Sequence, residues 1–361
     1  MISLFKVHYP EGVGHEIEKV FKSGFITEGE HSDRFENEFG RYVDNLNCSL
    51  VNSCTSALTL AYHLCELKPG DEIITTPMTC MATNEPISTF GADLIFADVD
   101  PSTGNIDPED ARRKITSKTR AIVGVHWAGD PFEIDEINSI ANECDARVIE
   151  DAAHALGATY KGKKIGNHSD NVCFSFQAIK HLTTGDGGAI FSKNLEDDER
   201  VKKLRWFGLD RKYPGNRWEQ DIIECGYKFH MNNLNAVIGL EQMKYIDKIV
   251  SSHRKNGLLL DENIYNSRVK KLSKNSDAES SFWIYTLLVD NQQDFKKHMS
   301  SRGIASDVVH MRNDRYSVFK RFQREQLPGI DEFGSRMINI PCGWWLSDND
   351  VKTIIDAVND Y

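Results

Sequence analysis

The sequence predicts an α/β protein whose larger part is built on a mostly parallel sheet. From residue 50 to residue 192, short apolar runs alternate with stretches in which apolar residues recur three and four positions apart. The short runs are almost continuously apolar, which is typical of strands covered on both faces. After Met231 the pattern changes to one long helix, and a smaller α+β arrangement follows from about residue 281. We therefore expect a large domain over residues 1–240, followed by a linking helix and a small C-terminal domain over residues 241–361.

The elements of the large domain follow from this periodicity. Six strands are expected, at residues 71–77, 94–99, 121–126, 147–151, 172–176 and 189–192. Four helices are expected between them, at residues 56–67, 81–90, 107–115 and 132–144. The third of these helices has Asp107 in the capping position and Pro108 in its first turn, a combination that favours a helix start.

The second half of the chain is expected to be linked to the first by one long helix. Its amphipathic pattern covers residues 234–249. The small domain is expected to contain strands at residues 282–289, 304–309 and 337–341, and a helix at residues 294–303. Ser347 is expected to cap the final helix. The apolar pattern leaves the strand order of this domain open.

Composition narrows the class of protein. The 54 acidic residues exceed the 43 lysines and arginines, which gives a net charge of −11 and argues against nucleic acid as a partner. The N-terminus lacks the apolar core of a signal peptide, and no run approaches the roughly 18 apolar residues of a membrane helix. Eight scattered cysteines, without metal spacing, indicate reduced thiols in a cytoplasmic protein. We expect an acidic cytoplasmic enzyme with neither a membrane partner nor a metal site.

Three segments carry groups that are expected to meet at the carboxyl ends of the parallel strands. Small polar residues at 52–58 open an apolar helix, where backbone N–H groups can bind an anion. The strand at 147–151 ends in Glu150 and Asp151, followed by small residues. Lys180 comes shortly after another strand and precedes a Gly-rich turn at 185–188, where a partly desolvated lysine can form a Schiff base. Taken singly, these features are also explained by a helix cap, a solvated loop acid and a surface lysine.

Pyridoxal 5'-phosphate chemistry needs all three features: a phosphate cradle, an acid beside the pyridine nitrogen, and a lysine. In this order the segments resemble the DegT/StrS family of sugar-nucleotide aminotransferases, which have the fold-type I architecture of aspartate aminotransferase. The resemblance covers nearly the whole chain. Its motifs lie at residues 22–29, 53–58, 69–74, 98–100, 149–155, 174–188, 226–227 and 236–240.

The resemblance implies a role for each of three residues around the cofactor's ring. Lys180 corresponds to the lysine that binds the cofactor covalently and later carries a proton between the donor's Cα and the cofactor's C4′. Asp151 corresponds to the acid that pairs with the pyridine nitrogen. His154 stands where the family usually has glutamine, near the phenolic oxygen.

The resemblance also implies a phosphate cradle and a substrate side. Ser175 corresponds to a cradle residue, and Cys54 and Thr55 to residues that act through backbone N–H groups. Thr27 lies in a loop that approaches the substrate in relatives. His310 falls where a family histidine faces the substrate.

The sequence departs from the family pattern at three positions. Cys54 replaces the glycine that opens the cradle helix, but its N–H can still donate. Cys80 occupies the position that commonly supplies an aromatic residue against the pyridine ring. Lys228 replaces the asparagine that reaches the phosphate bound in the other subunit, which a charged lysine is able to contact as well.

The resemblance therefore implies a pyridoxal-phosphate-dependent aminotransferase that acts on a nucleotide-linked keto-sugar, a 4-keto-6-deoxyhexose or a 3-keto sugar. L-Glutamate is the expected donor, and a homodimer with shared sites is the expected assembly. One alternative is a sugar 3-dehydratase of the same family, which carries histidine where Lys180 stands. Another is a regulatory homologue that has lost the chemistry. The aromatic pairs at 206–207, 282–285 and 344–345 are expected in the core or at interfaces.

Overall fold

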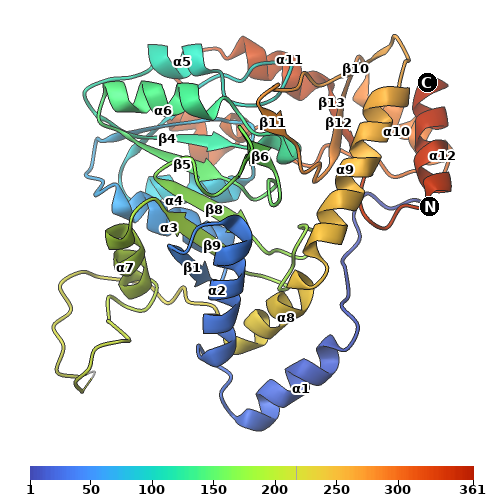
Figure 1. The fold of residues 1–361 in the computed structure, drawn as a ribbon. Helices are drawn as coiled ribbons and strands as arrows, with labels where there is room; N and C mark the ends of the chain where they lie inside the picture. Colours follow the sequence, from blue (N-terminus) through green and yellow to red (C-terminus); the bar gives the residue numbers. More distant parts are fainter. Residues whose placement is uncertain (217) are drawn as a thin grey trace.

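The structure is a computed structural model that describes residues 1–216 and 218–361 (Figure 1). Its centre is a seven-stranded sheet with the order β1-β9-β8-β5-β4-β2-β3. Six of these strands run in the same direction, and only β9 is antiparallel to its neighbours, β1 and β8. The mostly parallel sheet is thus confirmed. Its strands are β1 (Cys48–Val51), β2 (Glu72–Thr75), β3 (Asp93–Phe96), β4 (Thr119–Val125), β5 (Arg147–Asp151), β8 (Asn171–Ser175) and β9 (Gly188–Ser192).

All six strands expected in the large domain are present, together with β1, which the apolar pattern did not reveal. The four expected helices are also present, as α3, α4, α5 and α6. The helices of this part of the chain are α1 (Val13–Ser23), α2 (Glu30–Val43), α3 (Cys54–Leu64), α4 (Met81–Thr89), α5 (Pro108–Arg113), α6 (Ile134–Glu143) and α7 (Leu195–Leu204), with a short 3-10 helix η1 (Trp127–Gly129).

Helices cover both faces of the large sheet, because neighbouring residues of a strand point to opposite sides. In β2, Ile73 belongs to the apolar core that includes α3 and α4, whereas Ile74 belongs to the core of the other face, which includes residues of α2 and α6. Ile149 and Val148 of β5 divide in the same way. Both faces are therefore buried, which explains the almost continuous apolar runs in the sequence. A small sheet of β6 (Thr159–Tyr160), β7 (Lys163–Lys164) and β11 (Ala278–Glu279) lies beside it.

The single linking helix expected over residues 234–249 is in fact two helices, α8 (Asn233–Met243) and α9 (Ile246–Asn263). The apolar pattern continues through the break near Tyr245, so the sequence does not mark it. The two helices serve different packing partners: α8 lies against α2, where a Cβ on Gly239 would come within 2.4 Å of Phe35. The α9 helix runs from the large sheet to the C-terminal part of the molecule (Figure 1).

The C-terminal part contains a three-stranded antiparallel sheet with the order β10-β12-β13. Its elements are β10 (Val269–Lys271), β12 (Tyr285–Val289), α10 (Gln292–Ser301), the 3-10 helices η2 (Asn313–Arg315) and η3 (Ser317–Phe322), α11 (Pro328–Arg336), β13 (Met337–Ile340) and α12 (Asp348–Asn359). Its apolar core includes Leu287, Phe295 and Ile354. The N-terminal residues pack on this part, since the Trp345 indole donates to the Ser3 carbonyl at 3.1 Å.

Two expectations for this part have different outcomes. Ser347 caps α12 as expected, and its hydroxyl accepts the backbone N–H of Asp350 at 3.1 Å. The strand expected at 304–309 is not formed: Ile304 and Asp307 make only isolated bridges, to Ile2 and Asn339 respectively. Residues 304–309 thus contact two different neighbouring segments and do not pair with either one along their length. Within residues 1–216 and 218–361, every helix is too short or too polar to cross a lipid bilayer.

Candidate active site

Lys180 lies in a turn just beyond the end of β8. Its backbone N–H donates to the Gln177 carbonyl at 2.9 Å, and the Gln177 side chain accepts the N–H of Ile179 at 3.1 Å. Ser175, the last residue of β8, accepts the N–H of Gln177 at 3.3 Å. These local hydrogen bonds direct the lysine back over the end of the sheet. Its ammonium group lies 3.7 Å from the centre of the Trp283 ring.

The surroundings of Lys180 favour the neutral amine more than water does. Burial lowers the pKa of Lys180 to about 8, because a low-dielectric site disfavours the charged form. The Asp151 carboxylate opposes this effect, and the Cys54 and Cys80 thiols do so to a smaller extent. An amine with a pKa near the working pH is able both to take up and to release a proton.

Asp151 is the only member of the expected acidic pair that faces this cluster. Its Oδ2 accepts a hydrogen bond from the Thr83 hydroxyl at 2.6 Å, and its Oδ1 accepts the N–H of Ala153 at 3.0 Å. Glu150 points to the opposite face of the sheet, where it pairs with the fully buried His126 at 2.9 Å. The alternation of side chains along β5 therefore separates two neighbouring acids.

His154 and His310 form a stacked pair of neutral rings. The Nε2 atoms of the two histidines lie 3.4 Å apart, and their rings are parallel to within 7°. Burial lowers the pKa of His310 to about 3 and that of His154 well below its usual value, and the nearby Lys180 charge acts in the same direction. His154 also stacks on Trp283, with ring centres 3.8 Å apart. The Nδ1 of His154 is buried and has no hydrogen-bond partner among the described residues.

The start of α3 forms the anion-binding side of the cluster. The Ser53 side chain caps the helix by accepting the N–H of Ser56 at 3.0 Å. Cys54 and Thr55 follow in the first turn, where backbone N–H groups have no partner inside the helix and point outward. Gly188 of β9 packs against this turn so closely that a Cβ would lie 2.7 Å from the Cys54 nitrogen. Ser175 lies at the end of the strand next to β9.

The remaining expected residues occupy different places. Cys80 is exposed at the N-terminal cap of α4, and its thiol is close enough to Lys180 to influence its charge. Lys228 is exposed, with its ammonium 3.4 Å from the centre of the Trp206 ring. Thr27 is exposed beside α8, where its carbonyl accepts a backbone N–H at 3.1 Å. The Asn52 side chain, just before the start of α3, donates to the Lys228 carbonyl at 3.2 Å. Among the described residues, no hydrogen bond or ring contact joins Lys228 or Thr27 to Lys180, Asp151 or His154.

Two residues of the cluster were missed by the sequence analysis. Thr83 lies inside α4, and helical periodicity does not distinguish it from other buried residues. Trp283 is buried in the core, as expected, but the sequence did not reveal that its indole N–H donates to the Ile179 carbonyl at 2.9 Å, across 104 residues of chain. The Gly-rich turn and the strand ends can be recognised from neighbouring residues in the sequence. Thr83 and Trp283 have no such local pattern around them.

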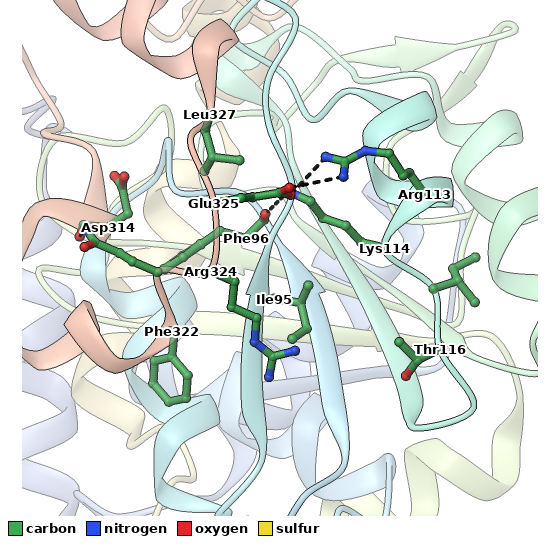
Figure 2. Close-up of a pocket in the computed structure, with 12 residues that line it drawn as sticks. Ile95, Phe96, Arg113, Lys114, Thr116, Asp314, Phe322, Arg324, Glu325 and Leu327 are labelled. Atoms are coloured by element: carbon green, nitrogen blue, oxygen red, sulfur yellow. Dashed lines mark hydrogen bonds and ion pairs between the residues drawn. The ribbon is translucent and has the colours of Figure 1, made fainter.

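A separate cavity of about 270 Å³ lies beside β3, between α5 and the segment that follows η3 (Figure 2). Its charged side chains neutralise one another, since Glu325 accepts from Arg113 at 2.9 and 3.1 Å and pairs with Lys114 at 2.7 Å. Arg324 pairs with acids of β2 and β3. The ion pairs that line this cavity join distant segments of the chain, and the residues drawn include no unpaired catalytic group.

The groups around Lys180 fit pyridoxal phosphate. The unpartnered Nδ1 of His154 provides a hydrogen-bonding group inside a buried site. Because Gly188 has no side chain to crowd the Cys54 nitrogen, the backbone N–H groups at the start of α3 stay free to bind a phosphate. Asp151 supplies an oriented carboxylate, and Lys180 an amine of lowered pKa. A mostly parallel sheet with these groups at its strand ends defines the fold-type I class of pyridoxal-phosphate enzymes.

Comparison with known proteins identifies the family within this class. Residues 11–359 match the model of the DegT/DnrJ/EryC1/StrS aminotransferase family, and the chain therefore belongs to that family. The crystal structure of the sugar aminotransferase CalS13 from Micromonospora echinospora has a TM-score of 0.96 and 34% identity, with 100% of both chains covered. The resemblance seen in the sequence is thus confirmed, and the protein is an enzyme of the aminotransferase class.

Two curated relatives are similar over almost their whole length. The spore coat polysaccharide biosynthesis protein SpsC of Bacillus subtilis is 31% identical, covering 96% of this chain and 93% of the relative. The UDP-4-amino-4,6-dideoxy-N-acetyl-beta-L-altrosamine transaminase of Campylobacter jejuni is 30% identical, covering 94% of this chain and 92% of the relative.

Proposed function

We propose that the protein transfers an amino group from L-glutamate to a nucleotide-linked keto-sugar, with pyridoxal 5'-phosphate as its cofactor. The observation that carries the proposal is the buried cluster of Lys180, Asp151 and His154, whose charges act on one another and on Cys54 at the start of α3. The name of the Campylobacter jejuni relative describes an amino group on a dideoxy sugar linked to UDP. A 4-keto-6-deoxyhexose is accordingly the proposed acceptor, with a 3-keto sugar as the second candidate.

Each of the three side chains has a separate role in such a transfer. When bound, pyridoxal phosphate withdraws electrons from the donor's Cα and so makes the proton there acidic. Lys180 holds the cofactor covalently at rest and, once released, takes up that proton and delivers it, for which a pKa of about 8 is well suited. Asp151 keeps the ring nitrogen protonated, and His154 directs its free Nδ1 to the phenolic oxygen.

The phosphate is held by backbone and hydroxyl groups on the other side of the site. Cys54 and Thr55 offer N–H groups at the start of α3, and Ser175 offers its hydroxyl. Cys80, at the start of α4, takes the place beside the ring that an aromatic residue holds in relatives. His310, whose ring stacks on that of His154, is proposed to meet the substrate.

A homodimer with shared sites is part of the proposal. Phe207, Ile222 and Ile223 are large apolar side chains that remain exposed in the segment before Lys228, and such a patch favours a protein contact. A second copy related by two-fold symmetry would cover it. In that dimer Lys228 is proposed to act on the phosphate bound in the other subunit, and Thr27 to lie near the substrate.

The 3-dehydratase alternative is less well supported. It requires a histidine at the position of Lys180, and the neighbouring His181 does not take over that place. The His181 ring bonds elsewhere: its Nε2–H donates to the Ser281 carbonyl at 3.0 Å, and its ring packs against His253. A catalytically silent homologue would have no need of the lysine, the acid and the cradle together.

The experiment that tests the proposal labels the catalytic lysine. Borohydride reduction of the cofactor-loaded enzyme, followed by peptide mapping, is expected to place the pyridoxyl group on Lys180. The Lys180→Ala variant should bind pyridoxamine phosphate but show no turnover. A label on the exposed Lys163 or Lys193 would refute the assignment. A panel of nucleotide-linked keto-sugars with glutamate, followed by mass spectrometry of the amine product, then identifies the acceptor.

A further inference from the structure

The Trp283 indole is fixed against the two chain segments that form the core of the site. Its N–H donates to the carbonyl of Ile179, the residue before Lys180, at 2.9 Å. Two residues earlier, the Ser281 hydroxyl donates to the carbonyl of His154 at 2.9 Å. Trp283 is only 2% exposed. The approach to β12 is therefore attached directly to the backbone that carries the lysine and the histidine.

The same ring lies against the lysine's ammonium group. Lys180 Nζ is 3.7 Å from the centre of the Trp283 ring, well inside the roughly 6 Å at which a cation is attracted to an aromatic face. No ion pair to Lys180 is present among the described residues, although Asp151 influences it from a greater distance. Tryptophan is the aromatic side chain with the strongest attraction for a cation. The indole is accordingly the nearest group that stabilises the charged lysine.

We propose that Trp283 is a catalytic residue that holds the ammonium group of Lys180 on its ring after the released lysine has taken up a proton. The inference rests on the proposed role of Lys180, because only a lysine that is released and recaptured in each cycle needs such a resting place. Trp283 stabilises this protonated form and keeps it within reach of the cofactor. No family motif in the sequence assigns this role to it.

The other groups around the lysine do not supply this stabilisation fully. Asp151 on β5, Cys54 at the start of α3 and Cys80 at the start of α4 favour the ammonium form, but burial outweighs them. His154 and His310 are neutral because burial lowers the pKa of each ring. Neutral histidines neither repel the ammonium group nor replace the attraction of the indole. The loss of Trp283 should thus lower the pKa of Lys180 further.

The experiment measures the pKa of Lys180 directly. In the enzyme loaded with pyridoxamine phosphate, the lysine is free, and its rate of acetylation by acetic anhydride can be followed against pH by mass spectrometry. The same titration is made on the cofactor-free full-length chain. Trp283→Leu is expected to lower the pKa of Lys180 by about one pH unit, from the known strength of cation–π contacts in desolvated sites. Trp283→Phe, which keeps an aromatic face, should lower it less.

Trp127 provides a matched control. Its indole is equally buried and meets the rings of both His154 and His310 edge to face, at 6.3 and 6.1 Å. Among the described residues it makes no contact with Lys180. Trp127→Phe and Trp127→Leu perturb the same packing and should leave the pKa of Lys180 where it is in the wild type.

The possible results separate this inference from the proposed function. An unchanged pKa of Lys180 in folded Trp283→Phe and Trp283→Leu, with borohydride labelling still at Lys180, would overturn the role of Trp283 and leave the aminotransferase proposal standing. Equal shifts in the Trp127 and Trp283 variants would also overturn it, since they would indicate loosened packing. Melting temperatures identify variants that do not fold, and Trp283→Phe, the smaller change, then decides the question alone.

Discussion

The hydroxyl of Thr83 donates a 2.6 Å hydrogen bond to Oδ2 of Asp151, from the first turns of α4 to the last residue of β5. Both side chains are buried. A second threonine, Thr79, lies 2.6 Å from the Thr83 hydroxyl and extends the chain of hydrogen bonds. A carboxylate that accepts such a bond is fixed in direction. In this way Thr83 prepares Asp151 to face a protonated ring nitrogen.

We expect Thr83→Val to slow the half-reaction with glutamate by roughly 10- to 100-fold, because a hydrogen bond to a charged group contributes about 1.5–3 kcal/mol. Asp151→Asn should slow it by further orders of magnitude without unfolding the protein. Single-turnover kinetics measure both effects. Thr89→Val is the control, since Thr89 lies in the same helix and bonds only to the local carbonyl of Pro86. Normal rates in Thr83→Val would show that Asp151 needs no such support.

The position of Lys228 predicts complementation between two inactive chains. If Lys228 acts on the other subunit's phosphate, a heterodimer of Lys180→Ala and Lys228→Ala has one site with both lysines and one with neither. Equal mixing yields half heterodimers, so about a quarter of the wild-type activity should return. Activity no greater than that of the separate parents would place Lys228 in its own subunit's site. Full activity of Lys228→Ala alone would mean that the contact is dispensable.

The lowered pKa of Lys180 predicts a cost to stability that depends on pH. The folded-state pKa of about 8 lies below the ordinary value of 10.5, so the cofactor-free fold is destabilised where the lysine is charged in the unfolded chain. Lys180→Met should therefore raise the free energy of unfolding at pH 7 by on the order of 3 kcal/mol, and with it the melting temperature. The advantage should shrink as the pH rises from 8 towards 10.5. Lys118→Met, at an exposed lysine, should show no such trend.

The exposure of Cys80 predicts selective protection by the cofactor. Cys80 is open to solvent, whereas burial raises the pKa of the Cys54 and Cys173 thiols well above the usual value and makes them unreactive. Iodoacetamide should therefore modify Cys80 in the cofactor-free protein, and saturating pyridoxal phosphate should slow that reaction at least several-fold. Peptide mass spectrometry follows each site. Cys144, half-buried at the end of α6, should react equally slowly in both forms. Equal reactivity of Cys80 in both forms would remove it from the cofactor site.

Much of the fold was predictable because its signals are local. Each strand of the large sheet in the stretch from 72 to 192 is a short apolar run, and each cap or Gly-rich turn beside it is a few residues long. The break at Tyr245 was not predictable, because the apolar periodicity continues from α8 into α9 while their packing partners differ. The residues at 304–309 read as a strand, yet Ile304 and Asp307 pair with separate neighbours.

The sequence by itself determined the class of sheet, the strand ends and the family, because apolar periodicity and contiguous motifs do not depend on distant contacts. It also placed Lys180, Asp151 and the start of α3 at one edge of the sheet. Only the tertiary structure decided which other side chains surround the lysine. Thr83 and Trp283 come from the interior of a helix and from the approach to a strand of the C-terminal sheet, and no local pattern distinguishes them. Their roles arise because burial and direction depend on how whole elements pack, which is a property of the complete fold.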